Sequence, residues 1–216
     1  MLFRSYLASP AIVAASAIAG CITTPGEIPA EPAVFSGSRH AVQGTRKEKV
    51  RSEKPTVVEG RVWIIPKDDI DTDMIFHNRY LTITDIKEMG QYTFDNLKGF
   101  EDFPKKAKKG DIVITNKNFG AGSSRQQAVD CFLSLGISCI LAESYGAIYE
   151  RNAINAAMPI LTYDPIQFEN IDLENGNRIK VDFISGVLTN LENDKKCVVN
   201  KFYDAQLAIY KNGGLL

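Results

Sequence analysis

The sequence has few of the residues that build a metal site or a disulfide framework. Its 216 residues include only two histidines and four cysteines, Cys21, Cys131, Cys139 and Cys197, with no C-x-x-C pair. Such isolated cysteines are typical of buried thiols in a reducing compartment, and a disulfide framework is disfavoured. We therefore expect this chain to form no zinc or iron–sulfur site by itself.

The sequence also lacks a surplus of basic residues and a long apolar run. Its formal net charge is −1, which argues against a general nucleic-acid binder because little positive charge is left to neutralise phosphates. No apolar run approaches the roughly 20 residues that span a bilayer, so we expect no membrane partner. With 44% hydrophobic and 24% charged residues, the composition is that of a globular protein with a substantial core.

The chain divides into three parts. Residues 1–22 are alanine-rich and predict a helix over about 9–19, with Ser9 as N-cap and Pro10 at the first helical position. Residues 23–56 contain four prolines and the charged run TRKEKVRSEK, a composition typical of a flexible linker. Residues 57–216 have the alternating pattern of a compact domain.

The alanine-rich stretch allows a second interpretation, because it ends in Ile-Ala-Gly-Cys at residues 18–21, the shape of a bacterial lipobox. Pro10 and Ser16 interrupt its weakly apolar core, however, and Arg4 alone makes a thin basic region. We therefore expect Cys21 to carry no lipid and the protein to be cytoplasmic.

From residue 57 onward the pattern predicts a mixed α/β domain. Helical patterns at about 83–96, 122–135, 144–156 and 203–212 lie among strand-like runs. The runs are 57–65, 111–115, 137–143, 159–163, 178–184, 187–191 and 196–202. Alternation of strand and helix in the middle favours parallel pairing, whereas the later, turn-separated strands favour antiparallel pairing.

The stretch NKNFGAGSSRQQAVDCF, residues 116–132, predicts an anion pocket. A strand leads into a loop with two glycines, then into a helix expected to start near Ser123. Ser123 and Ser124 would lie at the helix N-terminus, where free N–H groups favour an anion, and Arg125 adds a planar cation. The alternative is an ordinary serine N-cap after a glycine turn, which would explain one serine but not the whole cluster.

These residues carry a resemblance. NFGAGSSRQQA resembles the active-site loop of the swivel domain of the aconitase superfamily, found in the small subunits of isopropylmalate dehydratase and homoaconitase. KDDIDTDMIFHNRYL (67–81), AESYGAIYERNAINAAMPIL (142–161) and the closing AIYKNGGLL resemble further family segments in the right order. The resemblance implies an aconitase-type swivelling β/β/α domain with a mixed sheet.

The same resemblance extends to the first residues. SYLASPAIVAASAIAGCITTP resembles the carboxyl end of the family's large, cluster-bearing subunit. The order of tail, linker and swivel domain then reproduces the junction of a fused enzyme, so the chain would be a carboxyl-terminal piece of one or a small subunit carrying a remnant.

The resemblance implies a hydro-lyase that acts on a 2-hydroxy di- or tricarboxylate such as isopropylmalate. A [4Fe–4S] cluster would act as Lewis acid; it would be held by a cluster-bearing large subunit or N-terminal domains, and not by this chain. The partners expected are therefore that subunit and a small carboxylate substrate.

The resemblance also implies roles for individual residues. Ser123 matches the general base, and Ser124 and Arg125 would hold the substrate carboxylate. Asp73, whose alternative role is a turn or Asx cap, and Arg79 fall on the substrate side. Arg151 and Asn152 are expected to fasten the loop.

Two positions depart from the family pattern. Gln126 replaces the usual glutamate, which either weakens the positioning of Arg125 or leaves its charge freer for substrate. Thr82 lies in the specificity loop 78–85 where arginine would grip a distal carboxylate, so isopropylmalate or dimethylmalate is favoured over a homoaconitase-type substrate. Two further functions stay open, namely a non-catalytic anion- or RNA-binding module and an inactive remnant.

Overall fold

The computed structural model describes residues 8–28 and 54–215. The chain forms two compact units, Met1–Lys49 and Val50–Leu216, which are described separately. Most of the predicted linker, residues 29–53, lies outside the described residues, so the division at 22 and 56 stays a prediction.

The first unit contains helix α1, Pro10–Ala19. The hydroxyl of Ser9 accepts a hydrogen bond from the Ile12 amide at 3.4 Å, and the left-handed Gly20 (φ 73°) ends the helix. The predicted helix and its cap are therefore confirmed. Ser16 then binds the backbone of Thr23, which fixes a short 3₁₀ helix, η1 (Pro25–Glu27), beside α1. Within the described ranges, no helix is long and apolar enough to cross a bilayer.

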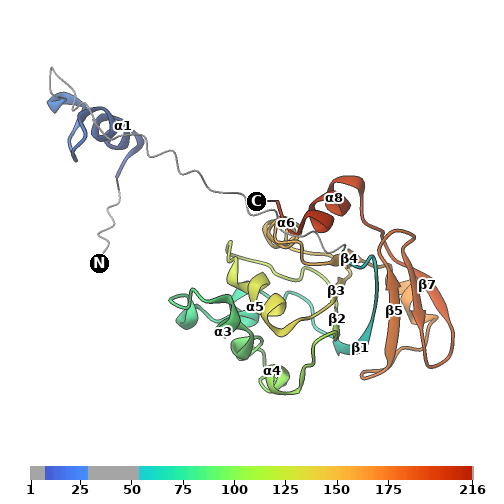
Figure 1. Ribbon diagram of the computed structural model, residues 1–216. Coiled ribbons are helices and arrows are strands. Elements are labelled where there is room, and N and C mark those ends of the chain that lie inside the picture. The colour runs from blue at the N-terminus through green and yellow to red at the C-terminus, as the bar shows by residue number, and fades with distance from the viewer. Residues whose placement is uncertain (1–7, 29–53, 216) are drawn as a thin grey trace. The chain divides into compact units, whose positions relative to one another are not determined.

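The second unit is built on one mixed sheet of seven strands in the order β4-β3-β2-β1-β5-β6-β7 (Figure 1). Strands β1 to β4 pair in parallel, and β1 pairs with β5 in antiparallel fashion, as do β5 with β6 and β6 with β7. The strands are β1 Val57–Ile65, β2 Ile112–Thr115, β3 Cys139–Ala142, β4 Ile160–Thr162, β5 Arg178–Asp182, β6 Val187–Asn190 and β7 Lys196–Val198. The predicted change from parallel to antiparallel pairing is confirmed, and β1 is the strand where it happens.

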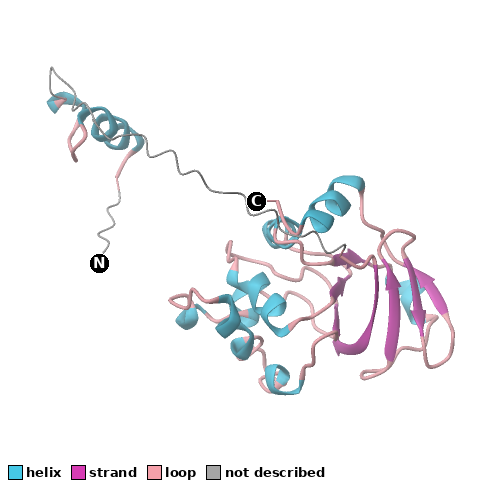
Figure 2. Cartoon of the chain, viewed as in Figure 1, coloured by secondary structure: helices cyan, strands magenta, loops and turns pink. Residues whose placement is uncertain are grey.

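The helices are shorter and more numerous than the sequence patterns predict (Figure 2). They are α2 Thr72–Ile75, α3 Ile86–Met89, α4 Phe103–Lys106, α5 Gln127–Leu135, α6 Ala147–Asn155, α7 Pro165–Glu169 and α8 Asp204–Asn212. The 3₁₀ helices are η2 Asn78–Tyr80 and η3 Gly90–Tyr92. The single helix expected over 83–96 is wrong, because α3 tightens into η3 at Gly90 and Phe94 takes a left-handed conformation (φ 62°).

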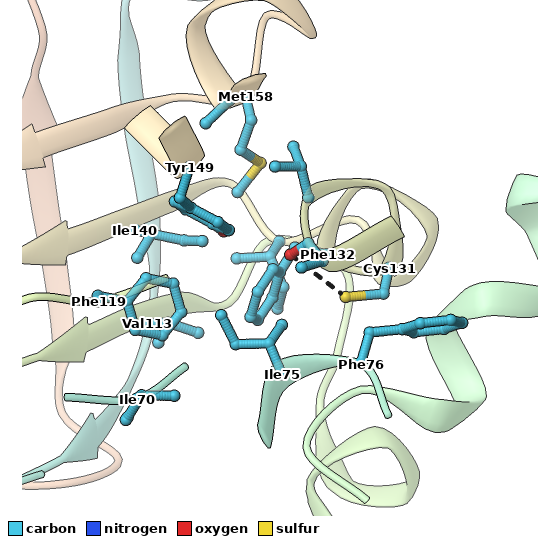
Figure 3. Packing of buried hydrophobic residues seen from close by; sticks show 14 of the residues in the cluster. Ile70, Ile75, Phe76, Val113, Phe119, Cys131, Phe132, Ile140, Tyr149 and Met158 are labelled. Atoms are coloured by element: carbon cyan, nitrogen blue, oxygen red, sulfur yellow. Dashed lines mark hydrogen bonds between the residues drawn. The ribbon is translucent and has the colours of Figure 1, made fainter. Parts of the chain in front are cut away.

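Successive side chains of a strand point to opposite faces, so the parallel strands, buried on both faces, supply two hydrophobic clusters. Val113 and Ile140 belong to the cluster that α5 and α6 cover; Figure 3 shows them facing Phe132 and Tyr149. Their neighbours along the strands belong to the second cluster, which continues under β5 to β7 and includes Tyr210 of α8. Packing on both faces therefore fixes the parallel half of the sheet. The loops that follow the carboxyl ends of these strands are held in place with it.

All four cysteines are free thiols. Cys131, Cys139 and Cys197 are buried, as expected, whereas Cys21 is exposed, so the expectation of a buried thiol is wrong at that position. Trp63 is partly buried against the first hydrophobic cluster, and its Nε1 donates to Asp111 at 2.8 Å.

Candidate functional site

The residues of the anion motif lie in a loop at the carboxyl end of β2, between loops that follow β1 and β3. Asp71 bridges to Ala121 and Phe119 bridges to Tyr145, both in parallel fashion, so the three loops continue the order of the strands. The amide of Thr72 donates to the Ala121 carbonyl at 2.9 Å. Ligands of open parallel sheets bind outside the carboxyl ends of the strands, and the motif lies at this edge.

Two glycines shape the loop. Gly120 (φ +76°) and Gly122 (φ +92°) adopt left-handed conformations that L side chains rarely take. At Gly120 a Cβ atom would also lie 2.1 Å from the Tyr149 ring, so the backbone reaches this position only because no side chain is present. The turn before Ser123 therefore depends on glycine for both conformation and space.

Helix α5 begins at Gln127, four residues later than predicted. Ser123 and Ser124 are therefore not its N-cap; they are exposed and lie in the loop that precedes it. Within residues 8–28 and 54–215, the amides of residues 123–126 donate to no acceptor. Four consecutive free N–H groups can bind an anion, so the chemistry expected of the helix N-terminus is available from this loop.

Arg125 is turned inward. Its side chain is 11% exposed, and Nη1 donates to the Thr72 carbonyl at 3.1 Å, to Asp73 Oδ1 at 3.0 Å and to the Phe76 carbonyl at 2.6 Å. The Nε and Nη2 groups donate to no acceptor of the described residues. One terminal nitrogen therefore anchors the guanidinium to α2, and the other N–H groups are available to a ligand.

Asp73 links the anion loop, residues 123–126, to the specificity loop, residues 78–85. Besides Arg125 it accepts the Asn78 amide on Oδ1 at 3.0 Å and the Asn96 side chain on Oδ2 at 3.3 Å, with His77 Nε2 3.9 Å away. Partial burial opposes ionisation, but hydrogen bonds from Arg125 and Asn78 outweigh it and hold the pKa of Asp73 below its usual value. Asp73 is thus an ionised acceptor; the cap of α2 is Asp71, which accepts the Asp73 and Met74 amides.

The two serines differ in their surroundings. Asn152 of α6 donates to Ser124 Oγ at 3.4 Å, a contact that fits the fastening role expected of Asn152. Ser123 Oγ forms no hydrogen bond with the described residues. Arg151 is exposed, and its side chain forms no hydrogen bond with the described residues that would fasten the loop. Ser123 therefore presents an unrestrained hydroxyl beside the free amides.

Arg79 and Thr82 are not brought into contact with the anion loop. Arg79 Nη2 donates to both carboxylate oxygens of Asp95, at 2.7 and 3.0 Å, and Tyr80 Oη donates to the same carboxylate. Thr82 is exposed in the turn that follows η2. The specificity loop reaches the anion loop through Asp73, whose Oδ1 accepts both the Asn78 amide and Arg125 Nη1.

Gln126, the departure from the family pattern, does not contact Arg125. Its Nε2 donates to Asp130 Oδ1 at 2.9 Å, one helical turn later. Burial raises the pKa of Asp130, which a hydrogen bond from Gln126 partly offsets. A glutamate here would repel Asp130, so the amide suits this chain, and Arg125 is positioned by α2 without it.

Three residues of the site went unnoticed in the sequence. Asp71 had a local signal, since its spacing before Asp73 and Met74 is that of an N-cap. Asp95 and Asn96 had none, because they reach the site across the fold from a loop.

Among the described residues, no group of three or more histidine, cysteine, aspartate or glutamate side chains could hold a metal ion. The described residues of this chain therefore do not fit an iron–sulfur cluster.

Comparisons with known proteins identify the family and the fold of this chain. Residues 58–166 match the family model "Aconitase C-terminal domain". The 3-isopropylmalate dehydratase small subunit of Clostridium acetobutylicum is 40% identical over 148 residues, 68% of this chain and 88% of that protein. The methanogen homoaconitase small subunit of Methanothermobacter thermautotrophicus is 34% identical over 160 residues, 74% and 89% of the two chains.

A crystal structure of 3-isopropylmalate dehydratase from Methanocaldococcus jannaschii superposes with a TM-score of 0.67 at 30% identity, covering 74% of this chain and 90% of that one. The expected fold class, a mixed α/β domain of this type, is confirmed. By the match over residues 58–166 and by identity over most of each relative's length, the chain belongs to the aconitase C-terminal domain family.

Proposed function

We propose that this chain is the swivel-domain part of an iron–sulfur hydro-lyase that dehydrates and rehydrates a 2-hydroxy dicarboxylate such as isopropylmalate. The observation that carries the proposal is the loop at residues 123–126, which combines two exposed serines, four amides without an acceptor among the described residues, and an inward-turned guanidinium anchored by one nitrogen. Such a loop suits a carboxylate, the group that every substrate of this class carries. The names of the relatives support the reaction class.

The chain's own residues have distinct roles in this proposal. Ser124 and Arg125 bind the carboxylate next to the carbon that loses its proton. Ser123, as an alkoxide, accepts that proton, and the C–H electron pair forms the double bond as the C–O bond to the departing hydroxyl breaks. Free amides and Arg125 stabilise negative charge on the serine and on the carboxylate as it develops.

The departing hydroxyl needs a Lewis acid, which a [4Fe–4S] cluster on a large subunit or N-terminal domains would supply. Activity therefore requires that partner. We propose on the family resemblance that the site comprises Ser123, Ser124, Arg125, Asp73, Arg79 and Thr82. For Arg125 and Asp73, the ion pair between them gives further support.

The substrate is proposed to lack a third carboxylate. Thr82 is small, uncharged and exposed at the position where a third carboxylate would need a cation in addition to Arg79. A relative named as a homoaconitase subunit keeps the homoaconitase-type reaction as the second candidate.

The experiment is reconstitution of the full chain with a cluster-bearing large subunit under anaerobic conditions, followed by turnover of isopropylmalate, dimethylmalate and homocitrate. We expect activity only in the assembled enzyme, with the highest kcat/KM for a branched dicarboxylate. Preference for homocitrate would favour the second candidate. A cluster-loaded complex that dehydrates none of the three would contradict the proposal, and salt-dependent RNA retention by the chain alone would favour the binding-module function.

A further inference from the structure

Arg79 and Arg125 are anchored in the same way. Each guanidinium gives one terminal nitrogen to an aspartate: Nη1 of Arg125 to Asp73 and Nη2 of Arg79 to Asp95. The remaining nitrogens of Arg79, Nε and Nη1, donate to no carboxylate or carbonyl of the described residues. A planar guanidinium held by one nitrogen still offers the N–H groups of its other two nitrogens to a carboxylate.

Asp95 is itself held in place from the core. Its second donor is Tyr80 Oη, and the Tyr80 ring stacks on Tyr92 with centroids 4.1 Å apart and meets Phe76 edge-on. The Arg79 guanidinium lies 4.9 Å from the centroid of the Tyr80 ring. Arg79 thus has an exposed side chain, 55% accessible, whose position is fixed by a half-buried aromatic pair and a carboxylate that is 21% accessible.

The two anchoring aspartates, Asp73 and Asp95, are linked through residues next to Asp95 and Arg79 in the chain. Asn96, which follows Asp95, donates to Asp73 Oδ2 at 3.3 Å, and Asn78, which precedes Arg79, donates its amide to Asp73 Oδ1 at 3.0 Å. A displacement of residues 95–96 would therefore shift the aspartates that accept hydrogen bonds from Arg79 and Arg125.

We propose that Asp95 is a positioning residue that holds Arg79 ready for the second carboxylate of a dicarboxylate substrate. The inference rests on the proposed function, since it needs a substrate with two carboxylates. Asp95 does not touch substrate; it acts through Arg79. Immobilising a long side chain in advance removes part of the entropy that binding would otherwise cost, which corresponds to about 2- to 10-fold in affinity.

The test compares Asp95→Asn with the wild type in the reconstituted enzyme. Asparagine can still accept from Tyr80 and Arg79 but lacks the charge, so we expect KM to rise about 2- to 10-fold while kcat stays within about 2-fold. The matched control is Asp102→Asn, which removes a carboxylate that pairs with Lys105 and touches neither arginine. Its KM should not change.

A double-mutant cycle separates positioning from a general structural role. If Asp95 acts through Arg79, the Asp95→Asn change adds nothing to KM in an Arg79→Lys background. An equal rise in both backgrounds, or a loss of kcat and thermal stability with KM unchanged, would overturn the proposal.

A measurement without turnover distinguishes failure of this inference from failure of the proposed function. In the isolated full chain, the Arg79 Nε–H signal in nitrogen–proton NMR should be dispersed in the wild type and should collapse toward the solvent-averaged position in Asp95→Asn. An unchanged signal would overturn the positioning role even if the enzyme is active. A changed signal in a complex that is inactive on every substrate supports the positioning and leaves the proposed reaction contradicted.

Discussion

Nη1 of Arg125 lies 3.0 Å from Oδ1 of Asp73, and the same nitrogen also meets two backbone carbonyls of the α2 segment. A side chain proposed to bind substrate is thus also a tie between two loops. Anchoring by one nitrogen reconciles the two roles, because the guanidinium fork keeps its other N–H groups.

Arg125→Lys should therefore weaken both stability and anion binding. The lysine side chain is one bond shorter than that of arginine, so its ammonium cannot take the position of Nη1, and the carbonyls of Thr72 and Phe76 would lose a charged donor. We expect a loss of about 1–3 kcal/mol in the free energy of unfolding, measured by urea denaturation. Arg178→Lys, in an exposed position on β5, is the matched control and should change stability by less than about 0.5 kcal/mol. An unchanged stability for Arg125→Lys would show that the tie to α2 contributes nothing.

Ser123→Ala should leave stability unchanged. Ser123 is exposed, does not cap α5 and forms no hydrogen bond with the described residues, so the change in unfolding free energy should stay below about 0.5 kcal/mol. In the assembled enzyme, turnover should nonetheless fall at least ~10²-fold, the low end for a positioned base.

The deciding measurement for Ser123 is single-turnover proton exchange at the substrate carbon, compared with loss of the hydroxyl. Ser124→Ala, which loses the contact with Asn152, serves as control: it should raise KM more than it lowers exchange. Wild-type exchange in Ser123→Ala would assign the base to another residue.

Gly120→Ala should be strongly destabilising. A Cβ atom there would lie 2.1 Å from the buried Tyr149 ring, and the φ of +76° would be strained for alanine. We therefore expect the free energy of unfolding, measured with heat or urea, to fall by about 2–5 kcal/mol. Gly99→Ala isolates the strain, because Gly99 has a similar φ of +89° with nothing within 4 Å of its Cβ position. That control should cost only about 1–2 kcal/mol. Equal losses in the two variants would mean that Tyr149 moves aside.

Asp111 should contribute to stability above about pH 4. Its carboxylate, 4% exposed, accepts from Arg61, Trp63 and the Lys108 amide. Burial alone would raise the pKa of Asp111, but these hydrogen bonds, chiefly that from Arg61, hold it below its usual value. A folded-state pKa below the unfolded value of about 3.9 means that the stabilisation is complete above that pH and is lost as pH falls through the folded value.

Asp111→Asn should therefore lower stability by about 1–3 kcal/mol at neutral pH, and the difference from wild type should shrink as the pH falls below about 4. Urea unfolding at a series of pH values measures both. Glu59→Gln, which removes an exposed partner of Lys180 at 3.7 Å, should change stability by less than about 1 kcal/mol. A difference that grows toward low pH would contradict a lowered pKa of Asp111 in the folded state.

The strands were predictable because each is a β-branched or aromatic run between turn residues, and the position of all seven is confirmed. The start of α5 was not, because Ser123 and Ser124 have the composition of an N-cap, whereas the helix begins at Gln127 without a side-chain cap. Composition identifies residues that could cap a helix; it does not say at which residue the first helical turn begins.

The partners of the two arginines lay beyond sequence reasoning for a different reason. Arg125 binds two backbone carbonyls, which every residue possesses, and Arg79 binds Asp95, 16 positions later and beyond the short helices α3 and η3. Neither pairing follows a helical or strand period, so no local pattern reports it. Family resemblance located the arginines, and the fold determines what holds them.

Strand β1 is the first strand of the domain along the chain, yet both of its neighbours are synthesised later. Residues 62–65 of β1 pair with β2, which begins at Ile112, and residues 57–61 pair with β5, which begins at Arg178. Until residue 178 has left the ribosome, the middle of the future sheet is an open edge with unpaired backbone groups, and such edges recruit other chains. Chains that stop before β5 should therefore aggregate, and the domain should reach its native state only after most of its length has been made.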